Sequence, residues 1–176
     1  ADVDRVYGEI GQETENLDYL FNNAGVWLDK SRVSLTDPSF SFDDVSRQFE
    51  VNAVGPLRVT RTFLPMLLAG SGKCIINLSS EAGSIGNAGR KCEYGYCMSK
   101  AALNMETKIL QNAYPEFRFY AIHPGWMKTP QGYAGATKDC TPQQEPSDTA
   151  EKLLTLAETK KYPYLYGDFE GNPMPW

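Results

Sequence analysis

Residues 73–80 have the sequence KCIINLSS, a short apolar run that stops at two serines. Two other segments follow the same pattern: LDYLF at 17–21 stops at NNAG, and FRFYAI at 117–122 stops at HPG. Short apolar runs that are bounded by turn residues are typical of strands buried on both faces of a sheet. The three segments therefore predict three strands of one buried sheet.

Segments with helical character separate these strands. Residues 41–68 begin with SFDD, a capping pattern, and predict a long helix with a disturbance at Gly55-Pro56. Further helices are predicted over 2–14, 95–113 and 148–159, a long loop over 126–146, and a short last strand over 164–167. This alternation predicts an α/β fold, a parallel sheet with helices on both faces, in a single domain over residues 1–176.

Composition excludes several classes of partner. The chain has 17 Lys and Arg against 22 Asp and Glu, a net charge of -5, so clustered basic residues for nucleic acid are lacking. The longest apolar runs are far shorter than the ~18 residues of a membrane span. Four cysteines without C-x-x-C spacing and a single histidine argue against a metal site. We expect reduced thiols and a cytoplasmic location.

The ends of the predicted strands carry unusual polar residues, and ligands bind beyond the carboxyl ends of parallel strands. Tyr96 and Lys100, four residues apart on a predicted helix, share one face of it. A nearby ammonium stabilises a phenolate and lowers the tyrosine pKa toward the range that a general acid or base needs. A hydroxyl at Ser79 or Ser80 is then placed to bond the carbonyl on which Tyr96 acts.

Five motifs occur in a fixed order along the chain. They are NNAG at 22–25, Asn52 within VNAVGP, Ser80 within INLSS, Tyr96-x-x-x-Lys100, and Pro124-Gly125 with Thr129. Together they resemble the short-chain dehydrogenase/reductase family. The stretches at 79–85, 98–105 and 123–126 resemble its C-factor and sniffer-type carbonyl reductases.

The resemblance implies a Rossmann-type sheet and an NAD(P)-dependent oxidoreductase for a small carbonyl compound or secondary alcohol. It makes Tyr96 the general acid/base. It also implies that Lys100 lowers the pKa of Tyr96 and binds the nicotinamide ribose, and that Ser80 positions the substrate oxygen. Asn52 is implied to hold a water for proton relay. The residues implied to contact NAD or NADP are Asn22, Ala24, Gly25, Tyr96, Lys100, Pro124, Gly125 and Thr129.

Two departures from the family pattern stand out. The spacing between Ser80 and Tyr96 is longer by a few residues, around 89–92. The glycine-rich loop that holds the cofactor pyrophosphate at a helix N-terminus is absent from the sequence. We therefore expect a chain truncated at its N-terminus by about three strands, with very weak dinucleotide affinity on its own. The strand at 17–21 then forms an unprotected sheet edge.

Three functional hypotheses remain open at this point. The first is the catalytic segment of an oxidoreductase. The second is a non-enzymatic remnant of such an enzyme that serves as a binding or assembly module. The third is a sugar-nucleotide epimerase or dehydratase, disfavoured because only a short segment follows Gly125.

The resemblance also implies a homodimer or homotetramer that assembles through the helices at 41–68 and 95–113, by an isologous contact. Phe49, Val59, Phe63 and Leu103 are the candidates for outward apolar positions on these helices, and a place in the core is their alternative.

Overall fold

The structure is a computed structural model that describes residues 2–29, 33–159 and 162–176. In chain order its elements are α1 (Asp2–Ile10), β1 (Tyr19–Asn22), α2 (Phe42–Phe49), η1 (Glu50–Val54), α3 (Gly55–Ala69), β2 (Cys74–Leu78), η2 (Glu81–Gly83), α4 (Tyr94–Ala113), β3 (Arg118–His123), α5 (Pro130–Ala134), α6 (Pro146–Thr159) and β4 (Tyr166–Asp168).

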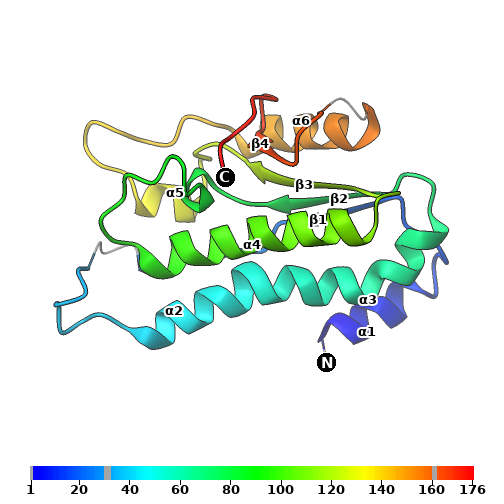
Figure 1. Cartoon of the computed structure of the whole chain (residues 1–176), viewed down its shortest axis with the longest axis horizontal. Coiled ribbons are helices and arrows are strands. Elements are labelled where there is room, and N and C mark those ends of the chain that lie inside the picture. The colour runs from blue at the N-terminus through cyan, green and yellow to red at the C-terminus, as the bar shows by residue number, and fades with distance from the viewer. Residues whose placement is uncertain (1, 30–32, 160–161) are drawn as a thin grey trace.

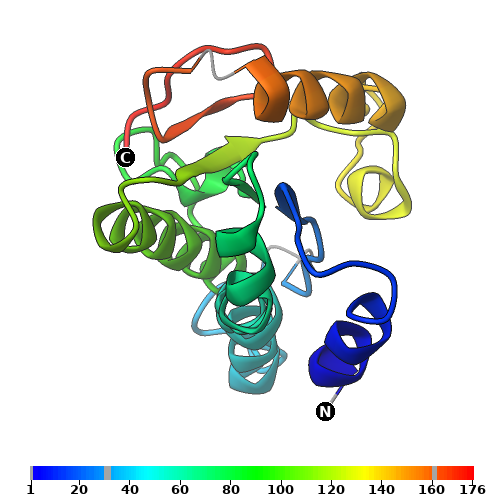
Figure 2. The same cartoon turned by 90° about the vertical axis from the view of Figure 1, so that its right-hand side faces the viewer.

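The described strands form one parallel sheet in the order β1-β2-β3-β4. Figures 1 and 2 show α3 and α4 on one face of this sheet and α6 on the other. Side chains of β2 alternate between the two sides: Ile75 packs with Phe63 and Leu67 of α3, while Ile76 packs with residues of α6. The α/β fold expected from the sequence is confirmed.

The predicted helix at 41–68 is interrupted by the π-helical turn η1. Ser41 caps α2 as expected, because its hydroxyl accepts a hydrogen bond from the Asp44 amide at 3.1 Å. At the other end of η1 the Gly55 amide donates to the Glu50 carbonyl, five residues back. Proline lacks an amide proton and its ring crowds the carbonyl four residues earlier, so Pro56 disfavours regular α-helix around Asn52. The disturbance thus lies just before Gly55-Pro56.

Two of the expected outward positions are wrong. Phe63 and Leu103 are only 5% and 1% exposed and belong to the core, and Val59 packs against the same core. Apolarity alone does not tell the outer face of a helix from the face toward a sheet. The exposed apolar side chains of α4 are Met98, Met105 and Ile109.

Other element boundaries differ from the sequence expectations by a few residues. Helix α1 ends at Ile10 rather than at 14, α6 begins at Pro146, and the short helix α5 lies within the predicted loop at 126–146.

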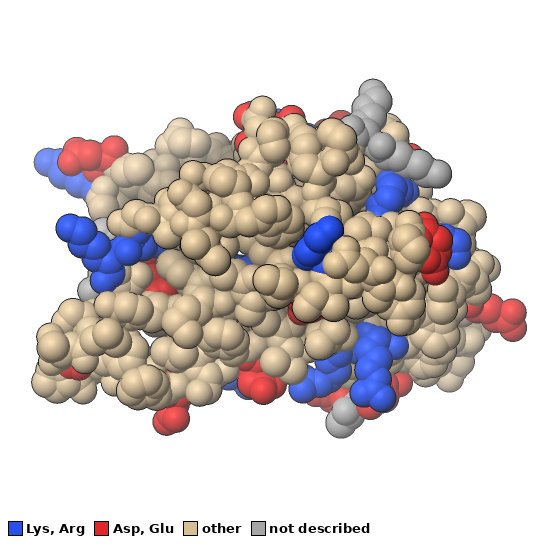
Figure 3. Space-filling view, in the orientation of Figure 1, with Lys and Arg blue, Asp and Glu red and all other residues tan. Residues whose placement is uncertain are grey.

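Within the described ranges, none of the helices combines the length and the apolarity needed to cross a bilayer. Figure 3, in the orientation of Figure 1, shows a face that is mostly uncharged, with separate groups of charged side chains that lie mainly toward its edges.

Candidate active site

A cleft of about 410 Å³ lies where β2 and β3 end. Its lining includes Ser80 after β2, Tyr96 from α4, and Pro124-Gly125 after β3. The segment that contains α5 forms another wall, to which Thr129 contributes. Because all the strands are parallel, their carboxyl ends meet at this one edge, as Figure 1 shows at its left side.

Ser80 and Ser79 differ in how their hydroxyls are used. The Ser80 hydroxyl accepts a hydrogen bond from the Ala82 amide at 3.1 Å and caps η2, so its own proton stays available to an acceptor in the cleft. The Ser79 hydroxyl donates its proton to Asn104 Oδ1 at 2.5 Å. Of the two serines, Ser80 is therefore the one equipped to donate to a ligand.

Tyr96 and Lys100 share one face of α4, as their spacing predicts. The Lys100 ammonium lies 5.9 Å from the centre of the Tyr96 ring, and it donates a hydrogen bond to the Leu78 carbonyl at 2.7 Å. Burial lowers the pKa of Lys100 to about 8. The lysine thus sits between the tyrosine and the end of β2.

The electrostatics of Tyr96 differ from the sequence expectation. Burial raises the pKa of Tyr96, and the opposing interaction with the Ser80 hydroxyl is smaller. The Glu81 carboxylate raises this pKa further. A lowered pKa was expected from the neighbouring ammonium, but burial disfavours the phenolate. Tyr96 is therefore a protonated phenol at neutral pH in this structure.

Asn52 lies behind Tyr96 and Lys100 and does not line the cleft. Its side-chain oxygen accepts from the Val26 amide at 2.8 Å, and its nitrogen donates to the Val26 carbonyl at 2.9 Å and to Ser99 Oγ at 3.0 Å. A Cβ at Gly25 would lie 3.5 Å from both Asn52 Oδ1 and Lys100 Nζ. The four expected catalytic residues are thus neighbours, but only Ser80 and Tyr96 face the cleft.

The residues expected beside a dinucleotide, apart from Tyr96 and Lys100, differ in their surroundings. Pro124, Gly125 and Thr129 line the cleft, and Ala24 and Gly25 are exposed. Asn22 is different, because its side chain is buried and donates to Asn77 Oδ1 at 2.8 Å and Thr60 Oγ1 at 3.2 Å. These bonds join β1 to β2 and α3, so the Asn22 side chain points into the protein.

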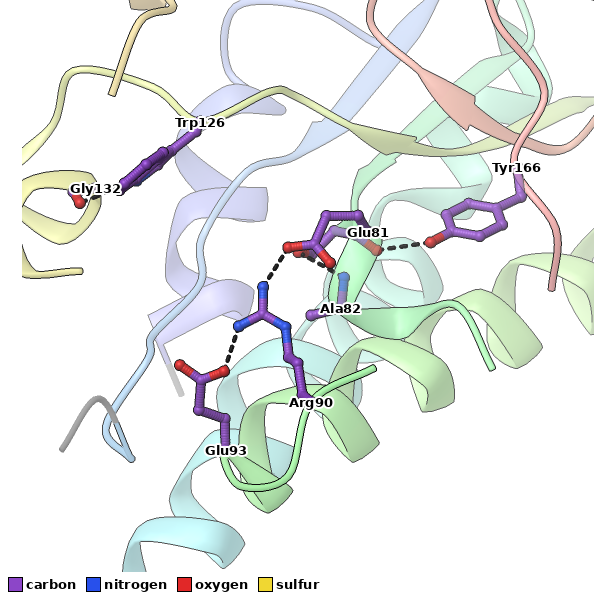
Figure 4. Close-up of polar contacts among 8 residues, drawn as sticks. Glu81, Ala82, Arg90, Glu93, Trp126, Gly132 and Tyr166 are labelled. Carbon is purple, nitrogen blue, oxygen red and sulfur yellow. Dashed lines mark hydrogen bonds and ion pairs between the residues drawn. The ribbon is translucent and has the colours of Figure 1, made fainter. Parts of the chain in front are cut away.

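Gly125 needs to be glycine for two reasons. Its φ is +81°, a region that side-chain-bearing residues rarely occupy, and a Cβ there would lie 2.8 Å from the Phe169 ring. Thr129 caps α5 by accepting a hydrogen bond from the Gly132 amide at 3.1 Å. Figure 4 shows the neighbouring Trp126, whose indole donates to the Gly132 carbonyl at 3.0 Å.

A charged cluster in the cleft wall was missed by the sequence reasoning. Arg90 forms ion pairs with Glu81 and with the buried Glu93, as Figure 4 shows. Glu93 has a left-handed backbone, with φ of 64°, at the start of α4. The lengthened spacing around 89–92 was the available signal, because the added residues form this loop.

Asp29 is a second residue that the sequence reasoning missed. Its carboxylate accepts hydrogen bonds from the amides of Gly95 and Tyr96, at 2.8 and 3.3 Å, in the first turn of α4. The loop after β1 is thereby attached to the helix end that carries the tyrosine. A carboxylate at a helix N-terminus is also favoured by the helix dipole.

A parallel sheet covered by helices, with a cleft beyond the carboxyl ends of its strands, places the chain in the general class of doubly wound α/β proteins. A family model for short chain dehydrogenase matches residues 1–138, and the chain belongs to this family. Over 170 residues it is 33% identical to "C-signal" of Myxococcus xanthus, covering 93% of this chain and 95% of that protein.

Other similar proteins are longer than this chain. "1-hydroxy-2-glutathionyl-2-methyl-3-butene dehydrogenase" of Rhodococcus sp. is 28% identical over 174 residues, which cover 95% of this chain and 74% of that protein. The solved structure of carbonyl reductase Sniffer of D. melanogaster is similar, with a TM-score of 0.81 and 26% identity, covering 99% of this chain and 73% of that one. An NADPH-bound carbonyl reductase from chicken fatty liver has a TM-score of 0.76 and 27% identity, covering 99% and 72%.

Proposed function

We propose that this chain carries the catalytic half of an NAD(P)-dependent carbonyl reductase, in which Tyr96 is the general acid. The observation that carries the proposal is the pairing of Ser80 and Tyr96 at one cleft, with Lys100 directly behind the tyrosine. The similarity to two carbonyl reductase structures, one of them bound to NADPH, supports the same substrate class.

The residues present fit the nicotinamide end of a dinucleotide. Gly25 lies beside Lys100 Nζ, which an added Cβ would contact, and Gly125, with its left-handed backbone, lines the cleft after β3. Lys100 would hold a ribose hydroxyl, and Pro124, Gly125 and Thr129 would border the nicotinamide. When bound, this group supplies the hydride. The sequence contains no glycine-rich loop for the pyrophosphate, so we expect residues 1–176 alone to bind NAD or NADP very weakly.

Ser80, Tyr96 and Lys100 have different roles in the reduction of the substrate carbonyl. The Ser80 hydroxyl donates a hydrogen bond to the carbonyl oxygen and holds it near the phenol of Tyr96. The protonated phenol then gives its proton to that oxygen as negative charge develops there. The Lys100 ammonium stabilises the phenolate that remains. Asn52 keeps the backbone at Val26 in place beside Lys100.

Steady-state reduction of a small aldehyde or ketone at high dinucleotide concentration tests this assignment. Tyr96→Phe should lower kcat by about 10²–10⁴-fold, the usual contribution of general acid catalysis, and leave dinucleotide binding nearly intact. Tyr94→Phe is the matched control, since Tyr94 lies in the same helical turn and its hydroxyl bonds the Lys91 carbonyl at 3.3 Å. A Tyr96→Phe variant with the wild-type rate would remove Tyr96 from this role.

The second candidate is a non-enzymatic binding or assembly module. Two observations favour it: the sequence lacks the pyrophosphate loop, and the similarity to C-signal covers nearly the whole of both chains. Turnover at high NADP or NAD concentration separates the two candidates, because residues 1–176 alone are expected to bind the dinucleotide very weakly in either case. Absence of turnover, in a chain with intact secondary structure by circular dichroism, would count against the enzyme and favour the module.

We also propose that the chain self-associates, as a homodimer or homotetramer, through the outer face of α3 and α4. Met98, Met105 and Ile109 of α4 and Leu57 of α3 are large apolar side chains on exposed positions. Light scattering of a Met105→Glu/Ile109→Glu variant should show a smaller species than the wild type. Leu154→Glu, on exposed α6, is the control that should leave the mass unchanged. A strictly monomeric wild type would contradict the proposal.

A further inference from the structure

The last strand of the sheet reaches the residue that carries the proposed substrate-binding hydroxyl. Tyr166 is the first residue of β4 and is only 1% exposed. Its hydroxyl donates a hydrogen bond of 2.7 Å to the backbone carbonyl of Ser80. Figure 4 marks this bond with the dashed line that starts at Tyr166. This bond joins two residues that are 86 positions apart in the chain.

Residues 173–176 fold back over the same place and hold both partners. The Trp176 ring lies 5.3 Å from the Tyr166 ring, centre to centre, and the Trp176 carbonyl accepts from the Gly86 amide at 2.6 Å. The Pro175 carbonyl accepts from the Ser84 hydroxyl at 2.6 Å. The segment after Ser80 is therefore attached to residues 166–176 at several points.

A second side chain supports this segment from α4. Asn104 is buried, accepts from the Ser79 hydroxyl at 2.5 Å and donates to the Gly83 carbonyl at 3.1 Å. Tyr166, Trp176 and Asn104 are not among the residues that line the cleft. Their hydrogen bonds to this segment are with the Ser79 hydroxyl and with backbone groups of Ser80, Gly83 and Gly86, so they act on the shape of the loop and leave the substrate face free.

We propose that Tyr166 is a positioning residue, whose hydrogen bond to the Ser80 carbonyl fixes where the Ser80 hydroxyl stands relative to Tyr96. The inference rests on the carbonyl reductase function proposed above. Apart from Tyr96, the described partner of the Ser80 hydroxyl is the amide of Ala82. Ala82 belongs to the same short segment as Ser80 and moves with it. Asn104 attaches the residues on either side of Ser80 to α4, and Tyr166 is the side chain that anchors the Ser80 carbonyl itself.

The chain offers variants that isolate the hydrogen bond from the packing. Tyr166→Phe keeps the ring and its contact with Trp176 and removes the hydroxyl, which bonds the Ser80 carbonyl and also interacts with the Asn104 side chain. Tyr164→Phe is the matched control: it removes a hydroxyl two residues away on the same segment, and no hydrogen bond from Tyr164 to Ser80 is found among the described contacts. Trp176→Ala is a second test variant at a half-exposed position, which leaves the Tyr166 hydroxyl in place but removes the ring that packs on Tyr166.

The kinetic test separates positioning from a general loss of structure. Misplacing a reacting group by about 1 Å costs roughly 10²-fold, and loosening Ser80 without deleting it should cost about tenfold in kcat. KM for the dinucleotide should stay within about twofold, because Tyr166 does not touch the cleft. Trp176→Ala should change kcat in the same direction by less, and Tyr164→Phe should match the wild type.

A spectroscopic test needs no turnover. The pKa of Tyr96 is measured as the difference in tyrosinate absorbance between each protein and its own Tyr96→Phe derivative. Glu81, Arg90, Cys97 and Lys100 are the charged and titratable groups that face Tyr96, and Tyr166→Phe leaves all of them in place. Because the Ser80 hydroxyl lowers the pKa of Tyr96, a displaced Ser80 should raise it.

The two readouts keep the outcomes apart. An inactive wild type would count against the proposed function, and the absorbance titration would still decide the role of Tyr166. An active wild type together with a Tyr166→Phe variant of unchanged kcat and unchanged Tyr96 titration would overturn the inference. If Tyr166→Phe does not fold, Trp176→Ala decides: unchanged kcat and titration in that variant would equally overturn it.

Discussion

Replacing Asn52 by alanine should destabilise the chain markedly, even though Asn52 lies outside the cleft. Its side chain makes three hydrogen bonds, two to the Val26 backbone and one to Ser99. Each bond contributes about 0.5–1.5 kcal/mol net, and alanine is better suited to helix by about half a kcal/mol. We expect Asn52→Ala to lower the free energy of unfolding by roughly 1–4 kcal/mol, and Tm by about 2–16 °C.

Urea unfolding followed by circular dichroism measures this loss, with the slope of the transition as the check on two-state behaviour. Asn23→Ala is the matched control, because Asn23 is exposed and has no side-chain hydrogen bond among the described contacts. Its midpoint should lie close to that of the wild type. An Asn52→Ala variant as stable as Asn23→Ala would refute the reasoning, since the three bonds would then contribute nothing to folding.

Two further predictions concern stability. Burial raises the pKa of Glu106 to about 8 from 4.5, so the folded state disfavours its ionised form, and the stability present at low pH is lost as pH rises through this window. We expect the free energy of unfolding of Glu106→Gln, relative to that of the wild type, to be higher at pH 8 than at pH 5. The same difference between the two proteins at both pH values would contradict this. A methyl at Gly70 would lie 1.9 Å from the Leu17 carbonyl oxygen, so Gly70→Ala should cost more than about 2 kcal/mol. Gly8→Ala, in open space within α1, should instead raise stability by about 0.5–1 kcal/mol, and similar Tm values for the two glycine variants would exclude the argument.

The sheet could be predicted from sequence because its strands are short, continuous apolar runs. Residues 73–78 and 117–122 correspond to β2 and β3 within a residue or two. The last strand was harder, because β4 has only three residues and its signal was two tyrosines in an irregular stretch. The helix at 41–68 was expected as one unit, since periodicity alone does not show how η1 rearranges the hydrogen bonds around Asn52.

The site could be predicted only in part. Tyr96, Lys100 and Ser80 follow from spacing and from strand ends, which are local features of the chain. The ion pairs of Arg90 depend on the path of a loop and on the left-handed backbone at Glu93, neither of which has a sequence signature. The pKa of Tyr96 was expected to fall and instead rises, because burial depends on the whole of the surrounding fold.

The hydrogen bond between Tyr166 and Ser80 has a consequence for biosynthesis. A ribosome makes the chain from its N-terminal side, so β1, β2, β3 and α4 are complete before β4 exists. A nascent chain that stops short of residue 166 holds Tyr96 and Lys100 on their helix but has no partner for the Ser80 carbonyl from β4. The cleft therefore acquires its final form only when residues 166–176 dock, and unfinished polypeptides lack this support for the Ser80 loop.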